Sequence, residues 1–315
     1  DGTVWLALDK EAARANVLSV PVLDELELAL DAASAYGPRG LVLFSGKPQG
    51  FIAGADIKEF TALAGETEVA ALLERAHRVF DRLEALNYPT VCLIHGYCLG
   101  GGLELAVACR YRVAQDDPRT FLGFPEVRLG LFPAFGGTVR AIRLIGMPSA
   151  MDMMISGRPV NARAGAELGL VDYAVPERYV VRAARALLQE APPPRRAPRR
   201  LSLMNLPLVR PAAARYLRRR AGADVRPDHY PAPYALIDLW RRWGDRPREM
   251  RAQERRAVAA LLNGPTARNL LRVFALQERL KSQGPRAGDP IERVHVIGGG
   301  VMGGDIAAWC ALQGL

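Results

Sequence analysis

The chain has 315 residues, of which half are hydrophobic and 24% are charged. This balance is typical of a folded globular protein and excludes the disordered and fibrous classes. No apolar run approaches the roughly 18 residues that a membrane span needs, so we expect no transmembrane segment. The net charge of +9 is matched by nine arginines in residues 195–220, a stretch that contains no acid. The basicity is therefore local. With no zinc-finger pattern and little aromatic interleaving, it predicts an Arg-rich linker or a patch that faces phosphates or a protein, and no nucleic-acid partner.

The spacing of the cysteines and histidines limits which kinds of metal site and disulfide the chain could contain. The cysteines lack the paired spacing of a zinc site or a disulfide framework, which indicates a reducing compartment. The histidines form no HxxxH or HExxH pair, so we expect no metal centre and predict that the chemistry uses carboxylates and backbone groups. These residues are Cys92, Cys98, Cys109 and Cys310, and His77, His95, His229 and His295.

The first two-thirds of the chain alternates strand and helix patterns. Residues 4–8, 41–44 and 90–95 are short apolar runs typical of buried strands. Residues 67–86 carry apolar side chains every three or four positions, which predicts a helix that Pro89 follows. Alternation of this kind predicts an α/β fold in which helices cover a sheet.

The composition changes after Pro192, where the Pro- and Arg-rich APPPRRAPRR interrupts the alternation and helical patterns follow. Near the end, an apolar strand is expected at residues 294–297, directly before a glycine-rich turn. Gly298, Gly300 and Gly303 have the GxGxxG spacing that lets a backbone approach the pyrophosphate of a dinucleotide at a helix N-terminus. We therefore expect these glycines to belong to the first βα unit of a truncated Rossmann domain that binds NAD.

Two glycine-rich turns stand where strands should lead into helices, in FIAGADIK (residues 51–58) and CLGGGLEL (residues 98–105). Such turns leave backbone N–H groups unpaired at the positive end of a helix dipole. Two of them facing each other would form an oxyanion hole without side-chain donors. The alternative is that the glycines only permit tight turns and close helix packing.

Two glutamates favour the catalytic interpretation. Glu104 lies in the apolar run CLGGGLELAVAC, where an ionised carboxylate is costly unless it has a partner. It follows Gly101 by three residues, so both lie on the same side of a helix. Glu126, in FPEV, is a second acid in apolar surroundings. Either residue alone could be a structural glutamate, but two acids beside an oxyanion hole indicate acid–base chemistry.

Three segments resemble the crotonase, or enoyl-CoA hydratase/isomerase, superfamily. They are FIAGADIKEF, HGYCLGGGLELAVAC and FPEVRLGLFPAFGGTVR, and the similarity extends over residues 1–192. The resemblance implies a crotonase-like ββα spiral, with oxyanion-hole amides on Ala55 and Gly101 and with Glu104 and Glu126 as the catalytic pair. Because both acids are present, it favours hydration of a trans-2-enoyl-CoA, with a Δ3,Δ2-enoyl-CoA isomerase activity as an expected side reaction.

The same resemblance implies how the substrate would bind. Coenzyme A, which is part of the acyl-CoA thioester substrate, should lie along Ala53, Asp56, Ile57 and Lys58. Hydration itself would need no cofactor. Side chains that could line the acyl pocket, or that could simply pack in the core, are Phe124, Leu131, Pro133 and Phe135.

A narrower similarity is to the alpha subunit family of the fatty-acid oxidation multifunctional enzyme. It is carried by ANVLS, SGKPQGFIAGADI, GGTVRAIRLIG, LGLVDYAVP and VIGGGVMGGDIA. In that family the hydratase is fused to an NAD-dependent 3-hydroxyacyl-CoA dehydrogenase. We therefore expect a hydratase domain at residues 1–192, an Arg-rich and mainly helical linker at 193–288, and the start of the dehydrogenase at 289–315.

That similarity also implies partners and a location. We expect an oligomer, a thiolase beta subunit as partner, and a cytoplasmic location, with the mitochondrial matrix as the alternative. The 315 residues alone are not expected to oxidise 3-hydroxyacyl-CoA. Two other interpretations stay open: a related acyl-CoA isomerase, dehalogenase or decarboxylase, and a non-catalytic acyl-CoA-binding scaffold.

Overall fold

Two strands followed by a helix form a unit that repeats three times along the chain. The first strand of each unit enters a large sheet, the second enters a smaller sheet, and the helix then returns across the core. The units are β2 (Gly40–Ser45) and β3 (Gly50–Ile52) with α2 (Ile57–Ala62) and α3 (Glu66–Glu84); β4 (Thr90–Ile94) and β5 (Tyr97–Leu99) with α4 (Gly101–Ala108); and β6 (Tyr111–Gln115) and β7 (Phe121–Gly123) with the 3₁₀ helix η1 (Pro125–Leu129).

The large sheet has the strand order β1-β2-β4-β6-β9, and every pair in it is parallel. Its edge strands are β1 (Thr3–Leu8) and β9 (Tyr173–Val175). The smaller sheet has the order β3-β5-β7-β8, with β8 (Val160–Asn161) antiparallel to β7. This topology is the ββα spiral that the sequence resemblance implied.

The large sheet is buried on both faces, as parallel sheets are. One face packs Val42 and Val91 against Ala184 and Leu187 of α8 (Glu177–Glu190). The other face belongs to the main hydrophobic core, which also takes side chains from the remaining helices. Successive side chains of a strand point to opposite faces, so the unbroken apolar runs of the sequence are a direct consequence.

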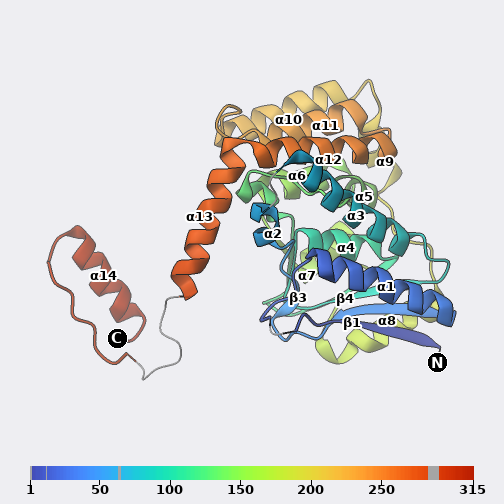
Figure 1. Ribbon diagram of the computed structural model, residues 1–315, viewed down its shortest axis with the longest axis horizontal. Helices are drawn as coiled ribbons and strands as arrows, with labels where there is room; N and C mark the ends of the chain where they lie inside the picture. Colours follow the sequence, from blue (N-terminus) through green and yellow to red (C-terminus); the bar gives the residue numbers. More distant parts are fainter. Residues whose placement is uncertain (1, 12, 63–64, 283–290) are drawn as a thin grey trace. The chain divides into compact units, whose positions relative to one another are not determined.

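Helices from beyond residue 192 pack onto this core. In Figure 1, α10 and α11 lie above α6, and α12 runs beside α5 and α3. The other helices are α1 (Val20–Tyr36), α5 (Gly137–Ile145), α6 (Met147–Ser156), α7 (Ala162–Leu168), α9 (Arg199–Ser202), η2 (Leu203–Asn205), α10 (Arg210–Asp224), α11 (Ala232–Trp243), α12 (Pro247–Asn263), α13 (Pro265–Ser282) and α14 (Val301–Leu312).

The computed structural model describes residues 2–11, 13–62, 65–282 and 291–315. The chain forms two compact units, Asp1–Arg272 and Val273–Leu315. The helices of residues 199–263 therefore belong to the same unit as the sheets. The expected boundary between residues 288 and 289 lies outside the described residues. In the described part of the chain, no helix is long and apolar enough to cross a membrane.

The strands and the helix expected in the first 100 residues are confirmed to within three residues at each end. The strand expected at residues 294–297 is not formed: these residues have no regular secondary structure. A strand needs a neighbour for its hydrogen bonds, and no described strand pairs with this segment. The expected helix after the glycine-rich turn is present as α14.

Candidate active site

The two glycine-rich turns meet at one end of the smaller sheet. They follow β3 and β5, which are parallel neighbours, so both chains leave the sheet at the same edge. Gly54 and Gly100 have φ angles of +130° and +54°, which L side chains rarely adopt. A Cβ atom on Gly100 would lie 3.7 Å from the Cα atom of Gly54. Glycine is thus required at both positions by the backbone angles, and the two turns lie next to each other.

An extended segment next to the first turn orients the Ala55 amide. Leu18 N–H donates to the carbonyl of Gly54 (2.9 Å), and Asp56 N–H donates to the carbonyl of Leu18 (2.8 Å). In an extended chain, neighbouring residues direct their amides to opposite sides, so the Ala55 N–H points away from Leu18. Gly101 is the first residue of α4, and its N–H has no acceptor within that helix. The Ala55 and Gly101 amides therefore belong to two adjacent turns, and their role as an oxyanion hole stays a prediction.

Asn16 fixes the position of this extended segment, a role the sequence analysis missed. Its side chain is buried and donates to the carbonyl oxygens of Leu8 (2.7 Å) and Phe51 (3.2 Å). The backbone carbonyl oxygen of Asn16 accepts the N–H of Ala53 at 2.9 Å. One buried amide side chain therefore ties β1 and β3 to the segment that pairs with Ala55.

Glu104 is 1% exposed and lies in the first turn of α4. Its Oε1 atom accepts the N–H of Phe135 (2.8 Å) and the N–H of Gly137 (2.7 Å). These amides stand at the N-terminus of α5, whose dipole also favours a negative charge. The two backbone donors thus give the Glu104 carboxyl group a defined orientation.

Glu126 reaches the same place from η1. A Cβ atom on Gly100 would lie 2.9 Å from its Oε1 atom, so the carboxyl group sits against the turn that begins α4. Both carboxyl oxygens are buried, and neither has a hydrogen-bond partner among the described residues. An ionised carboxylate without donors would be strongly disfavoured here, whereas a protonated one is tolerated.

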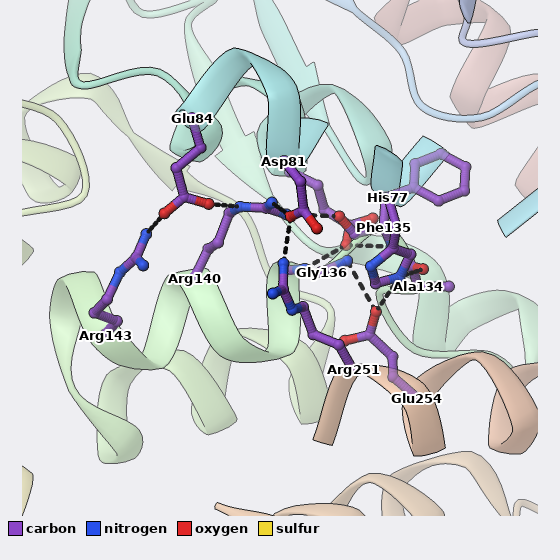
Figure 2. Close-up of polar contacts among 12 residues, drawn as sticks. His77, Asp81, Glu84, Ala134, Phe135, Gly136, Arg140, Arg143, Arg251 and Glu254 are labelled. Atoms are coloured by element: carbon purple, nitrogen blue, oxygen red, sulfur yellow. Dashed lines mark hydrogen bonds and ion pairs between the residues drawn. The ribbon is translucent and has the colours of Figure 1, made fainter. Parts of the chain in front are cut away.

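A third buried glutamate, which the sequence analysis did not identify, stands beside this pair. Glu254 comes from α12 and is fully buried. It accepts hydrogen bonds from the Gly136 amide and from the Thr138 hydroxyl, and its Oε1 atom lies 3.0 Å from His77 Nε2. Figure 2 shows His77 and Glu254 in contact with each other beside Gly136.

The three carboxyl groups cannot all be ionised, because like charges in a buried site oppose one another. Burial raises the pKa of Glu126 to about 8; its own backbone amide opposes this rise, and the charge of Glu254 adds to it. Burial also raises the pKa of Glu104, as do the charges of Glu126 and Glu254, while the two backbone amides oppose the rise. Glu104 accepts two amides at the N-terminus of α5, whereas no other described residue donates to Glu126, so we assign the proton to Glu126 and the negative charge to Glu104.

This assignment predicts a pH-dependent stability. Below the ordinary carboxyl pKa of 4.5, Glu126 is protonated in both the folded and the unfolded chain. Between 4.5 and about 8 only the unfolded chain releases the proton, so the folded state loses stability as pH rises, by about 1.4 kcal/mol per pKa unit at most. In urea unfolding, the free energy of unfolding of Glu126→Gln should therefore be similar to that of the wild type near pH 5. Near pH 8.5 it should be higher than that of the wild type, by several tenths to a few kcal/mol.

The control for this measurement is Glu167→Gln, which changes an exposed carboxylate on α7. It should show the pH dependence of the wild type. An equal difference between Glu126→Gln and the wild type at both pH values would contradict the assigned proton.

The residues expected near coenzyme A surround the first turn. Asp56 pairs with Lys10 (3.3 Å) and accepts the N–H of Lys58 (3.1 Å), while Ala53 and Lys58 are exposed and Ile57 is partly buried. A cavity of about 670 Å³ adjoins this region and is bordered by β1, the Asn16–Ser19 segment, the start of α1, Ile52 and Glu59. The cavity is a candidate for part of the coenzyme A path, which stays a prediction.

The four side chains expected at the acyl pocket, Phe124, Leu131, Pro133 and Phe135, are all buried. Phe135 lies nearest to the site: a Cβ atom on Gly101 would be 2.9 Å from its ring. The same ring packs edge-on against Phe80 at 5.8 Å. Phe135 is thus placed beside the Gly101 amide, and the acyl-pocket role of all four stays a prediction.

Gly298, Gly300 and Gly303 lie in the second unit, directly before and within α14. Gly298 has a φ angle of +106°, and a Cβ atom on Gly303 would overlap the Gly298 carbonyl oxygen. The turn therefore requires glycine at both positions, as a close backbone approach to a ligand would.

Comparisons with known proteins agree with this geometry. Residues 7–204 match the family model described as enoyl-CoA hydratase/isomerase. The chain is 37% identical over 321 residues to the fatty acid oxidation complex subunit alpha of Shewanella baltica, which covers 98% of this chain and 45% of that protein. It is 36% identical over 309 residues to the protein of the same name from Aliivibrio fischeri, with 96% and 45% covered. The chain thus spans about half the length of the curated relatives that it matches.

Solved structures show the same fold. An enoyl-CoA hydratase from Bacillus anthracis has a TM-score of 0.56 and 25% identity, with 90% of this chain and 95% of that chain covered. The human mitochondrial Δ3-Δ2-enoyl-CoA isomerase has a TM-score of 0.65 at 22% identity, with 90% and 96% covered. The spiral with its two sheets is common to these proteins.

Proposed function

The chain belongs to the enoyl-CoA hydratase/isomerase family, and on that premise we propose that it adds water to the double bond of trans-2-enoyl-CoA in fatty-acid β-oxidation. The observation that carries the proposal is the unequal pair of glutamates whose carboxyl groups are buried. The Glu104 carboxyl group accepts hydrogen bonds from two backbone amides, whereas no other residue in the described part of the chain donates to the Glu126 carboxyl group. Two neighbouring carboxyl groups with different proton affinities are suited to act as base and acid.

In the proposed reaction, the thioester carbonyl accepts hydrogen bonds from the Ala55 and Gly101 amides. Glu104 orients a water molecule and takes its proton as the oxygen attacks the β-carbon. Negative charge develops on the carbonyl oxygen, and Glu126 gives its proton to the α-carbon. Amides that bind the enolate oxygen more tightly than the ground-state carbonyl lower the barrier, and loss of one such donor typically costs about 100- to 1000-fold in rate.

The same pair could move a double bond, because one group can remove a proton that the other returns elsewhere. A Δ3,Δ2-enoyl-CoA isomerase activity is therefore the second candidate. The family to which the chain belongs, enoyl-CoA hydratase/isomerase, favours including it. A non-catalytic scaffold is disfavoured, because two buried carboxyl groups are costly to maintain without a task.

The experiment supplies crotonyl-CoA and a 3-enoyl-CoA to the purified chain in parallel and identifies the products. We expect crotonyl-CoA to become 3-hydroxybutyryl-CoA, and the 3-enoyl-CoA to be converted more slowly, first to its 2-enoyl isomer. Conversion of the 3-enoyl-CoA alone would assign an isomerase, and binding of both without turnover would assign a scaffold.

We further propose that residues 289–315 begin a 3-hydroxyacyl-CoA dehydrogenase domain that uses NAD. The glycine-only turn at Gly298–Gly303 supports this. Gly298, Gly300 and Gly303 would border the pyrophosphate, and the first amides of α14 would face it. NAD, when bound, would accept the hydride from the 3-hydroxyl carbon; hydration itself would use no cofactor.

The relatives are named subunits of a fatty acid oxidation complex and come from bacteria. This supports the proposal that the whole protein acts in the cytoplasm as part of an oligomer, with a thiolase beta subunit as its partner.

A further inference from the structure

Helix α12 lies outside the residues that match the family model, yet it delivers a carboxylate to the candidate active site. Glu254 is fully buried at the N-terminus of α5, close enough for its charge to act on both Glu104 and Glu126. The hydration mechanism assigns no task to this residue. A buried charge is expensive, so its contacts indicate what it does.

Consecutive donors at the start of α5 alternate between two carboxylates. The amides of Phe135 and Gly137 donate to Glu104. The amide of Gly136 (2.8 Å) and the hydroxyl of Thr138 donate to Glu254. These four donors belong to successive residues. The hydrogen bonds of Gly136 and Thr138 to Glu254 therefore also fix the direction of the Phe135 and Gly137 amides.

His77 of α3 ties Glu254 to the same turn. Its Nε2 atom lies 2.8 Å from the carbonyl oxygen of Ala134 and 3.0 Å from Glu254 Oε1. A carbonyl can only accept, so Nε2 carries a hydrogen. The turn is thereby held on both sides, from α3 at Ala134 and from α12 at Gly136.

A chain of ion pairs closes the outer side of the turn (Figure 2). Arg140 donates to the carbonyl oxygen of Phe135 at 2.9 Å and pairs with Asp81 and Glu84. Arg251, one turn before Glu254 on α12, also pairs with Asp81. Asp81 thus has two arginine partners, whereas Glu254 is held by donors of the turn and by His77.

We propose that Glu254 is a positioning residue of the hydration reaction, which holds the Phe135–Thr138 turn so that the amides of Phe135 and Gly137 stay directed at the Glu104 carboxylate. The proposal rests on the proposed function. If Glu254 has this role, helix α12 is part of the hydratase site and not only part of the linker between the two units.

The negative charge of Glu254 has a second consequence. It raises the pKa of both Glu104 and Glu126, so its removal lowers both. The other titratable or charged groups around the turn, among the described residues, are His77, Asp81 and Glu84 of α3, Glu104 of α4, Glu126 of η1, Arg140 of α5 and Arg251 of α12. A glutamine at position 254 keeps the size and removes only the charge.

The test compares Glu254→Gln with Glu249→Gln, which changes an exposed glutamate of the same helix. For crotonyl-CoA hydration, we expect Glu254→Gln to lower kcat by about 10- to 100-fold with little change in KM, because a small misplacement of a catalytic group is costly. The alkaline limb of its kcat/KM profile should move to lower pH, since Glu126 loses its proton more readily. The control should match the wild type in both respects.

A second variant separates position from charge. Glu254→Asp keeps the charge and shortens the reach, so kcat should fall while the alkaline limb stays near that of the wild type. If Glu254→Gln lowers kcat but leaves the alkaline limb of the kcat/KM profile at the wild-type pH, Glu254 has only a structural role and the proposal is overturned. An inability of both variants to fold would do the same.

A measurement without substrate keeps this test independent of the proposed function. The wild type should lose stability towards urea between about pH 5 and 8 as described for Glu126, and Glu254→Gln should show a smaller loss that ends at a lower pH, because only the folded-state pKa falls. If the wild type hydrates nothing, the proposed function fails, while this profile still reports whether Glu254 acts on the pair. An unchanged profile would overturn the link between them.

Discussion

Replacing Glu126 by glutamine is expected to lower kcat for crotonyl-CoA hydration by at least about 100-fold, the size of a general acid–base contribution. Glutamine has nearly the shape of the protonated carboxyl group, so it should fit among the same buried atoms. It cannot give a proton to the α-carbon at the required step. KM should change little, because the thioester is held by backbone amides and not by this side chain.

Glu167→Gln serves as the matched control, since it makes the same chemical change at an exposed position. Circular dichroism and urea unfolding near pH 5 should show Glu126→Gln to be folded and as stable as the wild type. A rate within a few-fold of the wild type would remove Glu126 from the mechanism.

Replacing Gly137 by alanine is expected to lower kcat on the order of 100-fold by displacing Glu104. A Cβ atom at this position would lie 2.6 Å from Glu104 Oε1 and 2.8 Å from its Cγ atom, which is closer than real Cβ contacts. The carboxylate must therefore move away from both amides that hold it. Such overpacking should also destabilise the fold, by about 1–3 kcal/mol.

Gly222→Ala provides the contrast, because an added Cβ in α10 would make only an ordinary contact with the Tyr234 hydroxyl at 3.4 Å. It should leave the rate unchanged and stabilise the helix by up to about 1 kcal/mol. Steady-state hydration rates and urea unfolding of both variants measure the two effects. A wild-type rate in Gly137→Ala would show that the position of Glu104 does not matter for hydration.

Much of the fold could be predicted from local patterns. Residues 41–44 and 90–95 are uninterrupted apolar runs because their sheet is covered on both faces. Gly54 and Gly100 stand out in the sequence because their backbone angles exclude other residues. Glu104 stands out because an acid in CLGGGLELAVAC has no polar neighbours to explain it.

The rest depends on contacts between distant segments. Glu254 lies in PREMRAQERRAVAALLN, where an acid among arginines is typical of a solvated helix face. Only the packing of α12 against α3 and α5 shows it to be buried. Asn16 lies in ANVLS, one of the segments that carry the resemblance, but its role has no local signal, since its partners Leu8, Ser45 and Phe51 are up to 35 residues away.

Which of Glu104 and Glu126 is protonated could not be predicted from the spacing of the residues in the sequence either. It follows from the number of donors around each carboxyl group, which only tertiary structure supplies. The strand expected at residues 294–297 fails for a related reason: an apolar run becomes a strand only when another strand accepts its hydrogen bonds.

In the proposed mechanism, Glu104 and Glu126 act as one catalytic unit. The most direct test measures kcat/KM for crotonyl-CoA in the wild type, in Glu104→Gln, in Glu126→Gln and in the double variant. Residues that act together show strongly non-additive losses. We predict that each single variant loses at least about 100-fold and that the double variant is at most about 10-fold slower than the slower single variant. A double variant whose loss equals the product of the two single losses, or a single variant with the wild-type rate, would contradict the claim.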